Sequence, residues 1–334
     1  MNIKRSALFP SVFCGVLFLA LGVPTDAATP PPPPQGDEEL RADGVRGLNL
    51  MMDGDPDAAI GIFRQLQAKD PQSPLGYLLE ADAIWWKVYY GTGNLVDPDV
   101  FEAVNALVTP FDSHFNDLIN AAIGKAEARL ESKQDVARSY LYFGMAYALK
   151  ARLIGLRGKD DLATARAGKK MRSALIKAVE LDPNLKDAYL GLGIYNYFVD
   201  TLPTIVKILS IFIALPGGDR ELGLKQLYDA AQQGELCAGE AKFYLAKDYS
   251  RTNEKLYGKS LQLFGELRRD YPNNPLWPLI IGSLRFRLGQ TQPGEALYRE
   301  VFKKTTGERG EVQQSVHRAA REALQRRHPG EKIE

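Results

Sequence analysis

One pattern recurs along the chain: a glycine or alanine in one predicted helix, an aromatic residue in the next, and a proline that ends the pair. If Pro71 is set at position 32 of such a unit, Gly47 falls at position 8, Ala59 at position 20 and Phe63 at position 24. Small residues at positions 8 and 20 let two paired helices approach closely, and proline stops the second helix. The pattern therefore predicts stacked helical hairpins, and no sustained alternation of Val, Ile and Thr argues for strands.

Further units follow, and position 8 is again small in units three to six, where it is occupied by Gly144, Gly193, Ala246 and Gly282. In unit three, Pro183 lies 36 residues after the position-11 residue Tyr147. Both helices of that unit should therefore be about two turns longer than usual. An amphipathic helix over about 311–326 has the apolar stripe that closes the end of a helical-repeat array.

These units resemble the tetratricopeptide-repeat (TPR) superfamily over residues 40–305. The resemblance implies an all-α fold, a TPR-like helical-hairpin solenoid of about five to six irregular repeats with a C-terminal capping helix. We place this solenoid at residues 39–327 and a short tail at 328–334.

A narrower stretch, residues 191–228, is similar to the eukaryotic TPR family associated with inclusion-body clearance. The similarity is carried by Gly193, Leu202-Pro203, Val206-Lys207-Ile208-Leu209 and Gly217-Gly218-Asp219-Arg220-Glu221-Leu222-Gly223-Leu224. That family has no established catalytic residues to transfer, so the similarity supports the fold and not a role.

The N-terminus has the features of a signal peptide. Lys4 and Arg5 precede an apolar stretch from Ala7 to Val23, and Thr25-Asp26-Ala27 is suited to cleavage after Ala27. The apolar stretch is short for a spanning helix, which needs roughly 20 residues. We therefore expect a periplasmic or secreted protein, with an uncleaved anchor as the alternative. The five prolines at 30–34 predict a stiff linker over residues 28–38.

The balance of charges and the cysteine content argue against two kinds of function, nucleic-acid binding and thiol chemistry. Without residues 1–27 the chain has 40 basic and 40 acidic residues, because the segment removes two of 42 and one of 41. Such balance does not favour a nucleic-acid partner. Cys237 would be the single cysteine of the mature chain, so no internal disulfide is expected, and a buried core position is favoured over a reactive or intermolecular thiol.

Enzyme motifs are missing from the sequence. The three histidines, His114, His317 and His328, have no neighbouring ligand cluster, and no hydrolase, phosphate-loop or dinucleotide motif occurs. We therefore expect no metal, no cofactor and no enzymatic activity.

The inner helices of such an array are expected to line a concave groove that binds a peptide or partner protein. Our candidates for that groove are Asp82, Trp85, Trp86, Tyr197, Phe198, Phe243, Lys247, Arg251, Phe286 and Arg287. Aromatic anchors give large buried area at low entropic cost. If Trp85 and Trp86 line the groove, alanine at both should abolish partner capture and preserve helicity. The alternative is that these aromatic residues pack against neighbouring helices.

The most apolar internal stretch, residues 202–215, is too short to span a bilayer. It is interpreted as a buried helix, a partner-docking site or a peripheral membrane contact. The leading functional hypothesis is an exported TPR-type scaffold for peptides or proteins. The alternatives are a membrane-apposed assembly factor that docks through 202–215 and a helical-repeat enzyme without a recognisable motif. The sequence does not indicate the partner or the oligomeric state.

Overall fold

The computed structural model describes residues 35–92, 94–96, 108–158, 160–201 and 216–330. The predicted signal segment, the prolines at 30–34, residues 97–107 and the apolar stretch 202–215 lie outside these residues. Within the described residues the secondary structure is α-helical and contains no strand. None of the described helices combines the length and apolar character needed to cross a bilayer.

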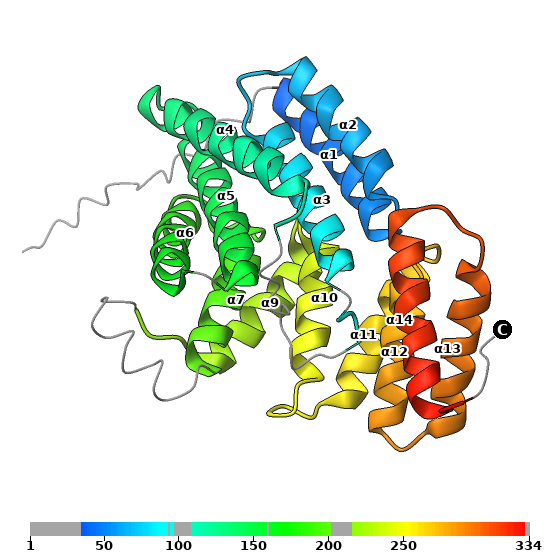
Figure 1. Ribbon diagram of the computed structural model, residues 1–334. Helices are drawn as coiled ribbons and strands as arrows, with labels where there is room; N and C mark the ends of the chain where they lie inside the picture. The colour runs from blue at the N-terminus through cyan, green and yellow to red at the C-terminus, as the bar shows by residue number, and fades with distance from the viewer. Residues whose placement is uncertain (1–34, 93, 97–107, 159, 202–215, 331–334) are drawn as a thin grey trace, which may run out of the picture. The chain divides into compact units, whose positions relative to one another are not determined.

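Within the described residues, twelve helices form six hairpins, and a thirteenth helix follows them (Figure 1). The hairpins are α1 (Gln35–Met52) with α2 (Pro56–Lys69), α3 (Leu75–Gly91) with α4 (Phe111–Glu131), α5 (Val136–Arg157) with α6 (Asp161–Leu181), α7 (Ala188–Thr201) with α9 (Arg220–Gln233), α10 (Ala238–Tyr249) with α11 (Tyr257–Asp270), and α12 (Leu276–Arg287) with α13 (Thr291–Thr305). The last helix is α14 (Glu311–Arg327). Each helix contacts the next along the chain. The predicted all-α, helical-hairpin repeat fold with a final helix is therefore confirmed for the described residues.

The small residues at position 8 lie where the helices of a hairpin approach most closely. A Cβ atom added to Gly144 in α5 would lie 2.5 Å from the side chain of Leu175 in α6. One added to Gly282 in α12 would lie 2.8 Å from the ring of Tyr298 in α13. These separations are too short for any side chain, so glycine sets the distance between the two helices.

The helix ends follow local sequence signals. Asp55 accepts a hydrogen bond from the Ala58 amide at the start of α2, where Pro56 occupies the first turn. The long third hairpin is also confirmed, because α5 and α6 have 22 and 21 residues. One boundary differs from the prediction: α1 begins at Gln35, so the end of the predicted linker is helical. Asp37 and Glu38 in its first turn favour helix at that point, since acidic groups stabilise a helix N-terminus.

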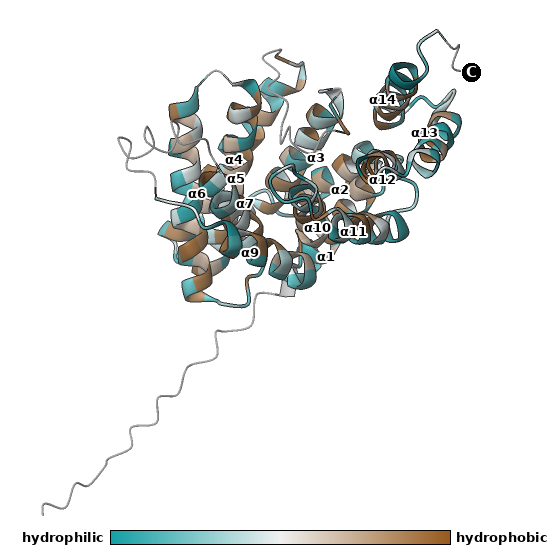
Figure 2. Cartoon of the chain, turned by 90° about the horizontal axis from the view of Figure 1, so that it is seen from below, coloured by the Kyte–Doolittle hydropathy of each residue, from teal (hydrophilic) through white to brown (hydrophobic). Residues whose placement is uncertain are grey.

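Contacts between distant hairpins accompany those between neighbours. α14 contacts α3, and α10 contacts α1. The turn after α1 meets the turn before α12, where Asp53 accepts hydrogen bonds from the amide and side chain of Asn273. Figure 2 shows hydrophobic residues mainly on the helix faces that meet other helices. The core is therefore continuous across hairpins that are far apart in the sequence.

Candidate functional site

Eight of the ten predicted groove residues belong to one array of charged and aromatic side chains on α3, on α7, and on α10 and the turn that follows it. Three cations lie over ring faces in this array, which we call the inner row. The Lys247 ammonium is 5.2 Å from the Tyr89 ring centre, and the Arg251 guanidinium is 5.1 Å from that of Phe198. Arg152 of α5 lies 3.5 Å from the Trp85 ring centre. Such stacking holds a cation strongly when water is excluded.

The centre of the inner row contains two buried carboxyl groups and one guanidinium. Arg152 donates to Glu240 at 2.8 Å and lies 3.5 Å from Asp82. It also contacts the Tyr244 hydroxyl. Burial, reinforced by the neighbouring Glu240 carboxylate, raises the pKa of Asp82 well above its ordinary value. The group therefore binds a proton more strongly in the folded protein than in the unfolded chain.

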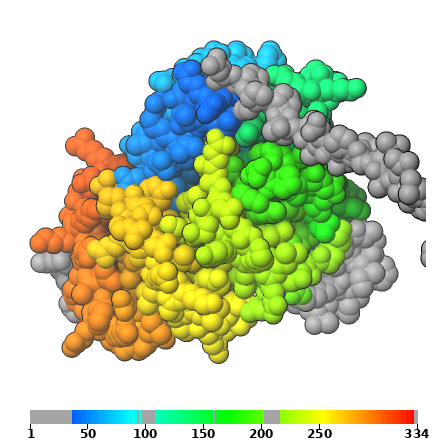
Figure 3. Space-filling view, turned by 180° about the vertical axis from the view of Figure 1, so that it is seen from behind, coloured from blue at the N-terminus to red at the C-terminus, as the bar shows by residue number. Residues whose placement is uncertain are grey.

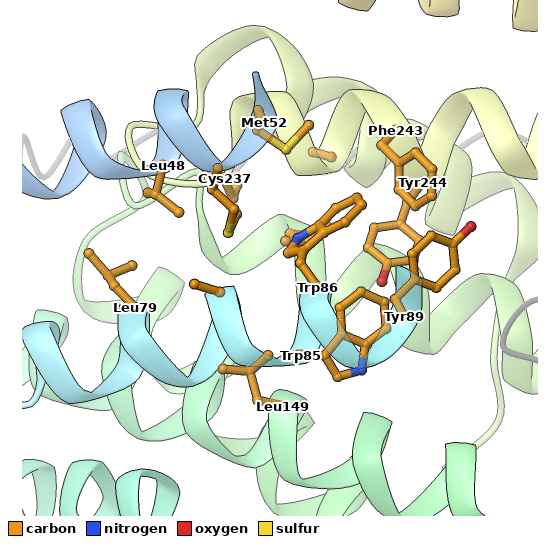
Figure 4. Packing of buried hydrophobic residues seen from close by; sticks show 14 of the residues in the cluster. Leu48, Met52, Leu79, Trp85, Trp86, Tyr89, Leu149, Cys237, Phe243 and Tyr244 are labelled. Atoms are coloured by element: carbon orange, nitrogen blue, oxygen red, sulfur yellow. The ribbon is translucent and has the colours of Figure 1, made fainter. Parts of the chain in front are cut away.

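The indole of Trp86 fills the space between α1, α3 and α10 (Figure 4). Its ring centre is 5.0 Å from that of Phe243, in a tilted arrangement. Tyr89 approaches the same Phe243 ring edge-to-face at 5.9 Å. In Figure 4 Met52 of α1 also lies close to the Trp86 ring. The aromatic residues thus join α3 directly to α10, although about half of the chain separates the two helices.

This packing corrects the expected open groove at six of the ten candidates. Asp82, Trp85, Trp86, Tyr197, Phe243 and Lys247 are all buried. The physical reason is that the inner faces of α3 and α10 pack against one another. Their apolar side chains are then removed from water, which is favourable. The alternative stated above, packing against neighbouring helices, is what the structure has for Trp85 and Trp86.

The remaining four candidates are half-buried. Phe198 and Arg251 form the outer end of the inner row, beside the buried carboxyl group of Asp248. Phe286 lies apart from the row in α12, where the Arg327 guanidinium is 3.2 Å from its ring centre. Arg287, also in α12, is half-buried. The ten candidates therefore do not form a single surface.

A hollow of about 230 Å³ lies between the end of α3, the start of α4 and the first turns of α14. Its walls include Lys87, Tyr90, Phe111, Glu311, Val312, Gln314, Ser315 and Arg318. The Lys87 ammonium lies 5.0 Å from the Phe111 ring centre and forms ion pairs with Asp57 at 2.7 Å and Glu311 at 3.0 Å. The hollow thus combines apolar surface with an amide, the ion-paired Lys87 and Glu311, and the guanidinium of Arg318. A second void, near Lys247 and Ser250, holds about 10 Å³, enough for roughly one water molecule.

Sequence reasoning missed two features: Arg152, which pairs with Asp82 and Glu240 in the inner row, and the hollow beside α14. Arg152 lies in the lengthened part of unit three, where the repeat pattern assigns no groove position. The hollow joins unit two to the last helix, and the amphipathic pattern of α14 indicated only a capping role. A lone arginine in a long, otherwise apolar helix face was the one signal available for Arg152.

The described residues contain no group of three or more potential metal ligands. Cys237 is buried, as the sequence favoured, and burial raises the pKa of its thiol, with a further contribution from Asp187. A thiol in this state is a weak nucleophile.

No family model matches the chain, and no curated protein matches it. Among solved structures, one similar chain is a thermophilic TPR protein of Thermus thermophilus. It is 14% identical, covers 74% of this chain and 99% of its own length, and has a TM-score of 0.42. The fold assignment therefore rests on the helix packing of the chain itself, and the similarity of residues 191–228 to the inclusion-body-clearance family is not confirmed.

Proposed function

We propose that this protein is an exported TPR-type scaffold that binds a peptide or partner protein, and that the hollow between α3, α4 and α14 receives one or two side chains of that partner. The observation that carries the proposal is the composition of the hollow. Two aromatic rings, a buried valine and two cations from three helices line it. Aromatic and arginine groups dominate the binding energy of protein interfaces.

The size of the hollow favours a partner side chain over a free small molecule. Its volume of about 230 Å³ is below the range of roughly 300–1,000 Å³ that is common for small-molecule pockets. Arg318 is exposed at its rim and donates to the Ser315 hydroxyl at 3.0 Å. A carboxylate of the partner would form a charge-assisted pair with this guanidinium. The preferred partner segment therefore carries an acidic residue next to an apolar one.

Site-specific crosslinking tests the proposal. A photoreactive residue in place of Gln314 should trap the partner, and Arg318→Glu should remove the crosslink by repelling its carboxylate. Arg321→Glu is the matched control, because it makes the same charge change on an exposed position of α14 outside the hollow. Equal crosslinking in both variants, at unchanged helicity, would exclude the hollow as the binding surface.

Export is proposed from residues 1–27 and requires its own test. The N-terminal sequence of the protein recovered from the cell envelope or the medium should begin at Ala28. Recovery of a chain that still begins at Met1 and sediments with membranes would support the uncleaved anchor instead.

A further inference from the structure

A second charged cluster lies where α1, α4, α5 and the α9–α10 connection meet, and it shares no residue with the hollow. In Figure 3 the segment that leads into α10 reaches between the first hairpin and the third. Its Glu235 accepts a hydrogen bond from Arg41 of α1 at 2.8 Å and lies 3.5 Å from Arg138 of α5. Asp37 of α1 lies 3.4 Å from Arg41 and 3.9 Å from Arg129 of α4. We call Arg41, Arg129 and Arg138 the arginine cluster.

Several buried polar atoms of this cluster lack a hydrogen-bond partner. They are Nε and Nη2 of Arg129 and the hydroxyl of Tyr142 in α5. Nε of Arg138 makes no hydrogen bond either, but it lies 3.3 Å from a carboxylate oxygen of Asp135. Each of these groups can donate a hydrogen bond, and no carboxylate oxygen of the cluster is among the unpartnered atoms. A buried donor without an acceptor is costly, so the cluster favours an occupant that is rich in acceptors.

The unpartnered buried atoms near the inner row include acceptors as well as donors. There, unfilled donors of Arg251 occur beside both unfilled carboxylate oxygens of Asp248. Donors and acceptors in one neighbourhood can satisfy each other after small side-chain movements. The arginine cluster has unpartnered donors but no unpartnered carboxylate oxygen, so small side-chain movements offer these donors no free acceptor.

The charge of the buried part is also unbalanced. The side chains of the three arginines and of Asp37 are between 6% and 14% exposed. The other two carboxylates are closer to solvent, where their charge is screened: Asp135, which lies 3.3 Å from Arg138, is 24% exposed and Glu235 is 43% exposed. Arg41 and Arg138 each pair with Glu235, whereas the one carboxylate near Arg129 among the described residues is Asp37, at 3.9 Å, so the Arg129 guanidinium is the least compensated of the three. An uncompensated buried charge is strongly unfavourable, so an added anion would stabilise this region.

We propose that the arginine cluster binds a small tetrahedral oxyanion, of the phosphate or sulfate type, to which Arg129 and Tyr142 donate. Guanidinium groups match oxyanions in geometry as well as charge. The donors come from two helices, α4 and α5, and a tetrahedral ion offers acceptor oxygens in more directions than a planar carboxylate does. Because Arg129 and Tyr142 are almost fully buried, the ligand is a free ion rather than a phosphate group carried on a macromolecule.

Thermal unfolding of the purified protein tests this site. Inorganic phosphate and sulfate are titrated at constant ionic strength, with sodium chloride replacing the ion that is removed. The unfolding midpoint should rise with the logarithm of phosphate or sulfate concentration once the site fills, since a ligand of the native state stabilises it by mass action. Acetate should produce a smaller rise at equal concentration. Equal midpoints in phosphate, sulfate and chloride would overturn the proposal.

Tyr142→Phe assigns the effect to this cluster, because it deletes a single oxygen atom. It should weaken the apparent phosphate affinity about tenfold, the usual order for one lost hydrogen bond to a charged group. Tyr140→Phe is the matched control on the same helix, where the side chain is half-buried and outside the cluster. Arg129→Met should abolish the response, and the two tyrosine variants decide the matter if that variant does not fold. An equal phosphate response in Tyr142→Phe and Tyr140→Phe would also overturn it, as would tighter binding of a phosphoserine peptide than of phosphate.

Discussion

The inner row makes a specific prediction about Arg152. Replacing it with methionine keeps much of the side-chain volume but removes the guanidinium from two carboxyl groups whose side chains are 9–10% exposed. The lost contacts are the 2.8 Å hydrogen bond to Glu240, the contact with Tyr244 and the stacking over Trp85. Removing one partner of a buried ion pair costs about 3–5 kcal/mol, because the other charge remains buried. We expect Arg152→Met to destabilise the protein by this amount.

The assay is thermal and urea unfolding followed by circular dichroism and by tryptophan fluorescence, to which the buried Trp85, Trp86 and Trp277 contribute. A loss of 3–5 kcal/mol lowers the midpoint of a domain of this size by about 6–10 °C. Arg268→Met is the matched control, since Arg268 pairs with Glu300 at 2.7 Å with both side chains more than 40% exposed. Such a surface pair contributes less than about 1 kcal/mol.

Two outcomes separate burial from simple charge counting. If Arg152→Met destabilises no more than Arg268→Met, the reasoning about burial is refuted. If Arg152→Met destabilises as expected, adding Asp82→Asn and Glu240→Gln to it should recover part of the lost stability, because the uncompensated carboxyl groups are then removed.

Three further predictions concern packing, protonation and thiol reactivity. Gly144→Ala should destabilise the protein by about 1–3 kcal/mol, because the added methyl group clashes with Leu175. Gly124 has open space around it, so Gly124→Ala should stabilise the protein by up to about 1 kcal/mol, and urea unfolding measures both changes. Burial raises the folded-state pKa of Asp82, so the stability that this group contributes is complete below pH 3.8 and is lost as pH rises toward the folded-state pKa. When the free energy of unfolding is measured against pH, Asp82→Asn should reduce the slope in that range by up to about 1.4 kcal/mol per pH unit. Cys237 should react with a thiol reagent only as fast as the protein opens, and rapid labelling without loss of helicity would contradict its burial.

The fold was predictable because its determinants are local. Gly144 and Gly282 act within one hairpin, and the second helices of units one, three and five are followed by Pro71, Pro183 and Pro272. Even the lengthened third hairpin could be read from the spacing between Tyr147 and Pro183. Patterns within one unit report on contacts within that unit and with the next one, which are the contacts that define a repeat fold.

The site was less predictable because its determinants are not local. The contact between Trp86 in unit two and Phe243 in unit five depends on the rotations accumulated over all the intervening hairpins. No residue of either unit specifies that sum. The position rule identified residues that do lie together in the inner row, Asp82 and Lys247 among them, but it assumed that the face they share stays open. Arg152 was missed for the same reason, since its partners come from α3 and α10.

This distinction changes how loss of binding in a variant must be interpreted. Alanine at Trp85 and Trp86 was expected to abolish capture and preserve helicity if the two indoles formed the groove. In the structure both are buried, and truncating a buried tryptophan costs about 3–5 kcal/mol, so helicity and capture should fall together. Lost capture in that variant is therefore no sign of contact with a partner. The substitutions at Arg318 and Arg321 avoid this ambiguity, because both are exposed on α14 and only one of them borders the hollow.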